Sequence, residues 1–137
     1  MALTEIHSNE YGKVEADPGN GLIKVTWLQH TSGAPFRELY GEALCHARAA
    51  GITLWLHDMR KLSYALIAEQ NWAVKDHFPA FDLTKRHRLA YVVRPQSLDL
   101  IPDTLIQEAI RKDPALAGSI EMEVFLDMEV AEHWLFL

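Results

Sequence analysis

The residues best suited to chemistry in this sequence lie in the stretch WLHDMRKLS, residues 55–63. It places an imidazole at His57, a carboxylate at Asp58, a guanidinium at Arg60 and a hydroxyl at Ser63. A histidine or carboxylate beside a cation suggests general base catalysis on an acidic substrate. Neighbouring residues of a strand point to opposite faces, however, so the side chains of His57 and Asp58 are expected to diverge. The simpler interpretation is that His57 packs against a helix while Asp58 caps a loop or pairs with Arg60.

Polar side chains also follow the next apolar run, LAYVV at residues 89–93. Open α/β sheets bind ligands outside the carboxyl ends of their strands. An enzyme built on this edge would hold an acidic or phosphorylated substrate with Arg60 and Arg94, and His57 or Asp58 would act as the base. With or without catalysis, the ligand site predicted at this edge consists of Asp58, Arg60, Ser63, Arg94 and Gln96.

Other catalytic and metal-binding patterns are missing from the sequence. The seven histidines are His7, His30, His46, His57, His77, His87 and His133, and no two of them are three or four residues apart. HExxH, GxSxG, GxGxxG and the P-loop pattern are also missing. The single cysteine, Cys45, falls in a helical pattern and is expected to pack against the core. We therefore predict no catalytic residue, no metal and no cofactor.

Trp72 is the tryptophan expected to be exposed, because it lies off the main apolar face of its helix, whereas the other three are predicted to be in the core. Together with Phe78 and Phe81 it would form an apolar surface patch, which is typical of a contact with a partner protein or with a second copy of the chain.

The composition excludes two classes of partner. The chain has 137 residues, of which 49% are hydrophobic and 23% charged, and a net charge of −6. Its only dense basic run is KRHR, residues 85–88, so nucleic acid is not expected as a partner. No apolar stretch approaches the roughly 20 residues of a membrane span. The first residues show no secretory signal, and a cytoplasmic location is expected.

The elements that must position these side chains follow from the periodicity of apolar residues. Residues 34–50 have the spacing of an amphipathic helix, with Thr31 or Ser32 as its cap, Pro35 in its first turn and Gly51 at its end. The turn signal DPGNG, residues 17–21, predicts a hairpin. Strands are predicted at residues 11–16, 22–28, 52–57, 89–93 and 120–126, with a weak segment at residues 3–6. Further helices are predicted at residues 65–78 and 102–112 and after Asp127.

The order of elements is therefore β-β-α-β-α-β-α-β-α. It predicts one α/β domain over residues 1–137, with a mostly parallel or mixed sheet of about five strands opened by a β-hairpin, and about four helices.

This order, and four stretches within it, resemble the STAS-like (SpoIIAA-like) small α/β proteins. The stretches are NGLIKVTW (20–27), WLHDMR (55–60), RLAYVV (88–93) and VFLDMEVAEHWL (124–135). Small bacterial members of the family have a similar strand ending in Trp, a similar WL-x-D-x-R and a closing helix with Ala and Trp-Leu. The resemblance covers nearly the whole chain.

The resemblance implies a regulatory role. Well-known members of the family regulate sigma factors through phosphorylation of a serine in an Asp-Ser pair, whereas this sequence has Leu62 before Ser63. The leading hypothesis is a non-enzymatic cytoplasmic module that binds a partner protein or a small ligand and self-associates. The alternatives are a small enzyme acting on an acidic or phosphorylated metabolite, and a carrier of apolar ligands such as lipids.

Overall fold

The computed structural model describes residues 2–62, 67–95 and 103–137. In this part of the chain, six strands form one mixed sheet in which their order is their order along the sequence. An antiparallel meander is followed by three parallel pairings, from β3 to β6. The strands are β1 (Thr4–Ser8), β2 (Gly12–Asp17), β3 (Leu22–Trp27), β4 (Leu54–Asp58), β5 (His87–Val92) and β6 (Ile120–Phe125). The predicted α/β fold is confirmed, and the weak segment near the N-terminus is a sixth strand.

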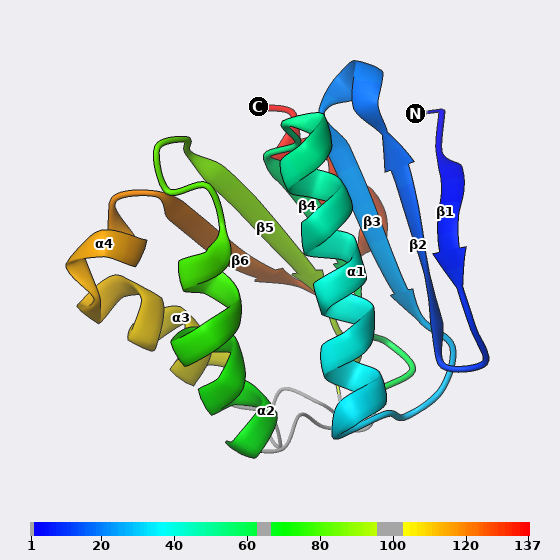
Figure 1. The fold of residues 1–137 in the computed structure, drawn as a ribbon, viewed down its shortest axis with the longest axis horizontal. Coiled ribbons are helices and arrows are strands. Elements are labelled where there is room, and N and C mark those ends of the chain that lie inside the picture. Colours follow the sequence, from blue (N-terminus) through cyan, green and yellow to red (C-terminus); the bar gives the residue numbers. More distant parts are fainter. Residues whose placement is uncertain (1, 63–66, 96–102) are drawn as a thin grey trace.

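Helices cover both faces of the sheet (Figure 1). The described residues form α1 (Ala34–Ala50), α2 (Ile67–Trp72), α3 (Asp103–Lys112), the short α4 (Pro114–Ala117) and α5 (Met128–Leu135). α1 packs on β2 and β3, α3 packs on β6, and both contribute to the larger apolar cluster. α5 packs on β4, β5 and β6 from the opposite face, where a smaller cluster lies. Trp55 and Leu56, adjacent on β4, belong to different clusters, as the alternation of a strand requires.

α1 has the bounds that its apolar period predicts. Its buried side chains follow helical spacing, and Pro35 lies in the first turn. Gly51 ends the helix with φ of 67°, and its N–H binds the carbonyl oxygens of Ala47 and Arg48. The predicted cap is wrong, because Gly33 is the capping residue and no side chain caps the helix. The hydroxyl of Thr31 instead donates to the carbonyl of Gln29, 3.0 Å away.

The hairpin predicted at DPGNG is confirmed as the connection between β2 and β3. Residues 18–20 form a single 3-10 turn, and Asp17 accepts hydrogen bonds from the backbone N–H and the side-chain amide of Asn20, at 3.3 and 2.6 Å. Gly21 closes the turn with φ of 67°, a value that favours glycine. These contacts lie in the turn that fixes the register between β2 and β3.

The helix predicted at residues 65–78 is confirmed in its described part, but it is not α-helical throughout. α2 ends at Trp72, a π-helical turn follows at Ala73–His77, and a 3-10 turn follows at Phe78–Ala80. A π-helical turn accommodates an extra residue and so shifts which side chains face the sheet. Here it allows the consecutive residues His77 and Phe78 both to be buried.

Replacing Gly12 and Gly41 by alanine should change the free energy of unfolding in opposite directions. A Cβ added at Gly12 would lie 2.7 Å from Leu39 Cδ2 and 2.8 Å from the carbonyl oxygen of Thr26, so the backbone must shift. Gly41 lies on the exposed side of α1 with nothing within 4 Å of such an atom. We expect Gly12→Ala to lower the free energy of unfolding by about 1–3 kcal/mol and Gly41→Ala to raise it by about 0.5–1 kcal/mol. Urea denaturation measures both, and a neutral Gly12→Ala would contradict the close packing of β2 against α1.

Candidate functional site

Asp58 and Arg60, both predicted to bind a ligand, bind each other. Asp58 ends β4, and its Oδ1 accepts from the backbone N and the Nε of Arg60 at 3.2 and 2.9 Å. Its Oδ2 accepts from Nη2 at 2.8 Å. Burial alone would raise the pKa of Asp58, but the hydrogen bonds and charge of Arg60 outweigh it, and the pKa is lowered. The predicted alternative in which Asp58 pairs with Arg60 is confirmed.

His57 and Asp58 do not form a catalytic dyad. His57 is fully buried on the α1 face of the sheet, where its ring stacks on Trp55 with centroids 5.6 Å apart. Asp58 is the next residue on the strand and lies on the other face, close enough to Lys24 for the lysine charge to lower its pKa. The predicted divergence is confirmed.

The structure therefore brings together only part of the site predicted at the carboxyl edge. Arg94 is exposed and its Nη2 donates to the carbonyl of Leu62 at 3.4 Å. Ser63 and Gln96 lie outside the described residues. The two arginines that would hold an acidic substrate thus both have partners from the chain itself.

The predicted surface patch of Trp72, Phe78 and Phe81 is wrong. Phe78 and Phe81 are 1% and 3% exposed and pack edge to face, with centroids 5.7 Å apart. Phe81 also stacks on Trp55 at 5.1 Å, so both phenylalanines belong to the core. Trp72 is half-buried.

Instead, a ring of aromatic side chains forms beneath the carboxyl ends of β4 and β5. Centroid distances are 4.9 Å from Phe36 to Tyr40, 5.4 Å from Tyr40 to His77, 5.1 Å from His77 to Trp72 and 6.4 Å from Trp72 to Phe36. Each ring contacts the next, so Phe36, Tyr40, Trp72 and His77 close a circuit, which we call the four-ring cage. All four border one cavity of about 20 Å³, together with Tyr91.

The hydroxyl of Tyr40 connects this cage to the buried strand β4. It accepts from the indole Nε1 of Trp27 at 3.3 Å and lies 3.3 Å from both His57 Nδ1 and Met59 Sδ. The Tyr40 hydroxyl donates to Met59 Sδ, and its hydrogen bond with His57 Nδ1 has a direction that depends on the imidazole tautomer. The other ring nitrogen of His57, Nε2, is buried. In the described part of the chain, that Nε2 has no hydrogen-bond partner.

Both histidines near the cage are neutral at pH 7. Burial lowers the pKa of His57 well below 6.5, and the neighbouring His77 lowers it further. Burial lowers the pKa of His77 to about 3. His77 Nε2, like that of His57, is buried and has no partner among the described residues. Neutral imidazoles in an apolar pocket are suited to binding a polar group rather than to carrying charge.

Glu69 brings a buried carboxylate to the same cavity. The residue is 3% exposed, its Oε1 accepts from the backbone N of Gly33 at 3.2 Å, and Arg37 Nη2 lies 3.6 Å from that oxygen. The other oxygen, Oε2, is buried and has no hydrogen-bond partner within the described ranges. The residues that border the cavity therefore combine aromatic rings with two buried polar atoms, Glu69 Oε2 and His77 Nε2, that have no hydrogen-bond partner in the described part of the chain.

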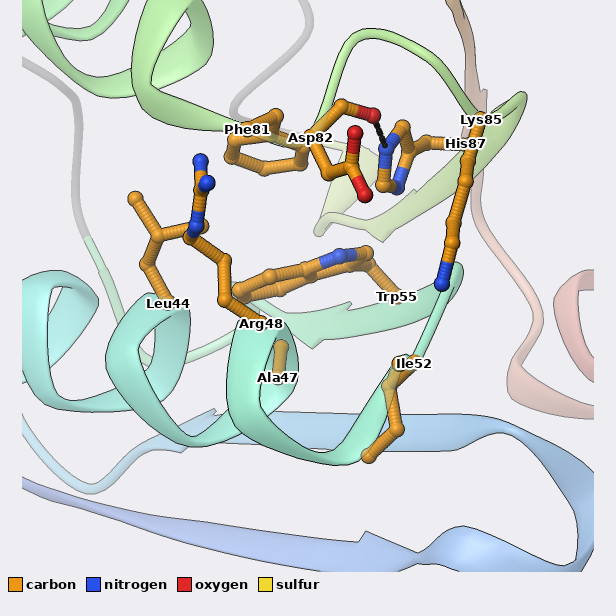
Figure 2. A pocket seen from close by; sticks show the side chains of 10 residues that line it. Leu44, Ala47, Arg48, Ile52, Trp55, Phe81, Asp82, Lys85 and His87 are labelled. Atoms are coloured by element: carbon orange, nitrogen blue, oxygen red, sulfur yellow. Dashed lines mark hydrogen bonds between the residues drawn. The ribbon is translucent and has the colours of Figure 1, made fainter.

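A second, smaller cavity of about 10 Å³ lies at the opposite end of β4 (Figure 2). Arg48 and Lys85 stand on either side of Trp55, and His87 Nε2 donates to the carbonyl of Asp82 at 2.8 Å. Because a carbonyl only accepts, neutral His87 has a bare Nδ1. That Nδ1 and the Nε1 of Trp55 are buried and unpaired within the described residues. The space suits a single bridging water molecule.

The sequence did not predict that His57, His77 and His87 would lie among packed aromatic rings. His57, His77 and His87 are 20 and 10 residues apart, so no local spacing relates them. Their proximity depends on the register of β4 and β5 and on the π-helical turn. The one available signal was the concentration of Trp, Phe, His and Tyr between residues 72 and 91.

Two further observations limit the chemistry of the described residues. Among them, no three His, Cys, Asp or Glu side chains are placed to hold a metal ion. Cys45 is exposed, which corrects the prediction that it packs against the core; its position lies beside the buried stripe of α1 rather than in it.

The chain matches no protein-family model, no curated protein and no solved structure. Within the described residues, no helix has the length and apolar character needed to cross a bilayer.

Proposed function

We propose that this protein is a STAS-like, non-enzymatic cytoplasmic module that binds a small molecule at the four-ring cage in a regulatory role. The kinship rests on the four stretches of sequence that resemble the family. The binding site rests on one observation: a cavity beneath the carboxyl ends of parallel strands has aromatic walls and buried polar atoms that have no hydrogen-bond partner among the described residues. Ligand sites are typically mostly apolar, with a few polar groups that orient the ligand.

The geometry supports binding over catalysis. His57 is separated from Asp58 by the sheet and is held by Tyr40, while Asp58 is occupied by Arg60. An enzyme acting on an acidic metabolite would need free cations, and Arg60 and Arg94 already have partners. The cavity of about 20 Å³ also gives no room for an acyl chain, which disfavours a lipid carrier. A polar head group the size of a water molecule fits it.

Ligand binding would be transmitted to a partner through the conformation of the chain around Trp72 and Ala73, which border the cavity. Trp72 and Ala73 are half-buried and stand at the junction of α2 with the π-helical turn. A ligand that contacts both sides of this junction stabilises one conformation of the turn over others, and its differential affinity sets the size of the shift. A partner protein would then read the surface above Trp72.

Native mass spectrometry tests the proposal directly. The protein as purified, or after incubation with a mixture of small metabolites, should carry a single small-molecule adduct. Trp72→Ala removes one wall of the four-ring cage and should abolish the adduct. Lys75→Ala, an exposed position in the same segment, is the matched control and should retain it. An adduct that survives Trp72→Ala would place the ligand elsewhere, and a protein that takes up nothing from the mixture would contradict a small-molecule role.

A further inference from the structure

The cavity enclosed by the four-ring cage has the chemistry of a cation site. Its walls present the rings of Phe36, Tyr40 and Trp72, whose faces attract positive charge through their quadrupoles. A carboxylate, Glu69, lies at the same cavity with one oxygen unpaired in the described chain. Aromatic rings around a carboxylate form the standard recognition pattern for organic cations, because the rings exclude water and the carboxylate supplies the opposite charge.

The polar atoms of the cavity match the donors of an ammonium group. An ammonium has three N–H donors and no acceptor. Glu69 Oε2 is an acceptor, and neutral His77 offers its Nε2 as a second acceptor when its proton is on Nδ1. Both atoms are buried and have no partner among the described residues. The residues are 3% and 4% exposed, so neither atom is satisfied by bulk water.

The size of the cavity selects the head group. Its roughly 20 Å³ holds one group of the size of a water molecule. A primary ammonium has that size, whereas a trimethylammonium head would require the rings to separate. Trp72 and Ala73 are half-buried, so the cavity lies close beneath the surface and the alkyl part of a ligand can extend outward.

The chain already places one of its own cations against the outer side of this site. The guanidinium of Arg37 lies 5.8 Å from the ring centroid of Trp72, and its Nη2 is 3.6 Å from Glu69 Oε1. The Arg37 side chain is 43% exposed and therefore free to swing into solvent. The position of Arg37 shows that the Trp72 ring and the Glu69 carboxylate together attract a cation. The Arg37 guanidinium would therefore compete with a cationic ligand that binds in the cavity.

From these contacts we infer that the four-ring cage binds the ammonium head of a primary alkylamine, held by Glu69 and His77 between the rings of Phe36, Tyr40 and Trp72. This inference rests on the proposed small-molecule site and specifies the class of ligand that it takes.

Titration of ¹⁵N-labelled protein with methylammonium chloride tests it, with potassium chloride at equal ionic strength as the control. The indole N–H signals of Trp72 and Trp27 report on the cage, since Trp27 donates to Tyr40. We expect saturable shifts with methylammonium only. Glu69→Gln should weaken binding at least about tenfold, because the charge that pairs with the ammonium is lost. Glu38→Gln, which neutralises an exposed carboxylate on α1, should bind as the parent protein does.

A second variant, Arg37→Gln, tests the ammonium site independently if Glu69→Gln does not fold. Arg37→Gln removes the competing guanidinium from an exposed position, and it should tighten methylammonium binding by about threefold or more. Unchanged affinity in Arg37→Gln, equal affinity in Glu69→Gln, or equal shifts with potassium would each overturn the ammonium site.

Methanol, an uncharged probe of about the same size as methylammonium, separates this inference from the proposed function. Saturable shifts of the same indole signals by methanol, without any by methylammonium, would retain the small-molecule site and reject the ammonium class. Shifts by neither probe would reject both.

Discussion

Lowering the pH from 7 to 5 is expected to reduce the free energy of unfolding by about 2 kcal/mol through His77, and His57 adds a loss of the same sign. Both side chains are buried, and their folded-state pKa values lie below the ordinary 6.5, that of His77 at about 3. At pH values between the folded-state pKa of a buried histidine and its ordinary pKa of 6.5, the unfolded chain binds a proton that the folded protein does not. The free energy of unfolding therefore falls as the pH falls. The loss approaches about 1.4 kcal/mol per pH unit and per histidine within that window.

The carboxylates with shifted pKa values titrate below this pH range. The carboxylates of Asp17, Asp58 and Asp82 have lowered pKa values, so they lose their contribution only below the ordinary 3.8. His87 acts in the same direction as the two histidines of the cluster, since burial lowers its pKa although its hydrogen bond to Asp82 opposes this. The decline between pH 6.5 and 5 therefore reports on buried imidazoles.

Urea unfolding followed by tryptophan fluorescence at pH 7 and pH 5 measures this decline. His77→Phe keeps an aromatic ring in the four-ring cage and should reduce the loss of stability between pH 7 and pH 5 by about 2 kcal/mol. His133→Gln, at an exposed position on α5, should leave it unchanged. A stability that is constant from pH 7 to pH 5 would mean that these imidazoles are hydrated or protonated in the folded protein, contrary to their burial.

Tyr40→Phe should lower the free energy of unfolding by about 2–4 kcal/mol, because it leaves two buried groups without their partner. The lost hydroxyl accepts from Trp27 Nε1 and pairs with His57 Nδ1, each at 3.3 Å. Removing one side of a buried hydrogen bond exposes the desolvation penalty of the other, about 1–3 kcal/mol per group. Chemical denaturation at pH 7 measures the effect.

Two comparisons make this experiment specific. Tyr11→Phe, at a half-buried tyrosine, should change the stability by less than about 0.5 kcal/mol. In the double variant Tyr40→Phe/His57→Phe, the orphaned imidazole is gone, so the combined loss should be smaller than the sum of the two single losses. Strict additivity would show that the hydroxyl and the imidazole do not interact.

Local patterns predicted the parts of the fold that local physics determines. α1 was predicted with its bounds because an apolar stripe, an early Pro35 and Gly51 at a positive φ all agree. The hairpin at DPGNG follows from turn chemistry in the same way. β1 was excluded from the strand count because it is an edge strand whose side chains are mostly exposed and whose register shifts between Glu5 and His7, so its alternation is weak.

The candidate site depends on information that a single sequence does not display. Tyr40 meets His57 only because α1 packs on the face of the sheet from which His57 projects, and His77 joins them where the chain changes from α- to π-helical geometry after Trp72. The charged residues that looked most reactive, Asp58 and Arg60, neutralise each other over two residues of chain. Strand alternation predicted the divergence of His57 and Asp58, but the aromatic surroundings of His57 arise from tertiary packing.

The sequential strand order also has a consequence for synthesis on the ribosome. Each strand pairs with the one made just before it, so the sheet can grow at one edge while the chain is still being extended. The exception is the face formed by Leu22, Leu56, Ala90 and Val92, which is covered only when Ala131 and Leu135 of α5 arrive. A nascent chain that has completed β6 therefore carries a finished sheet with one bare apolar side. Chaperone binding should concentrate at that stage and end when α5 docks.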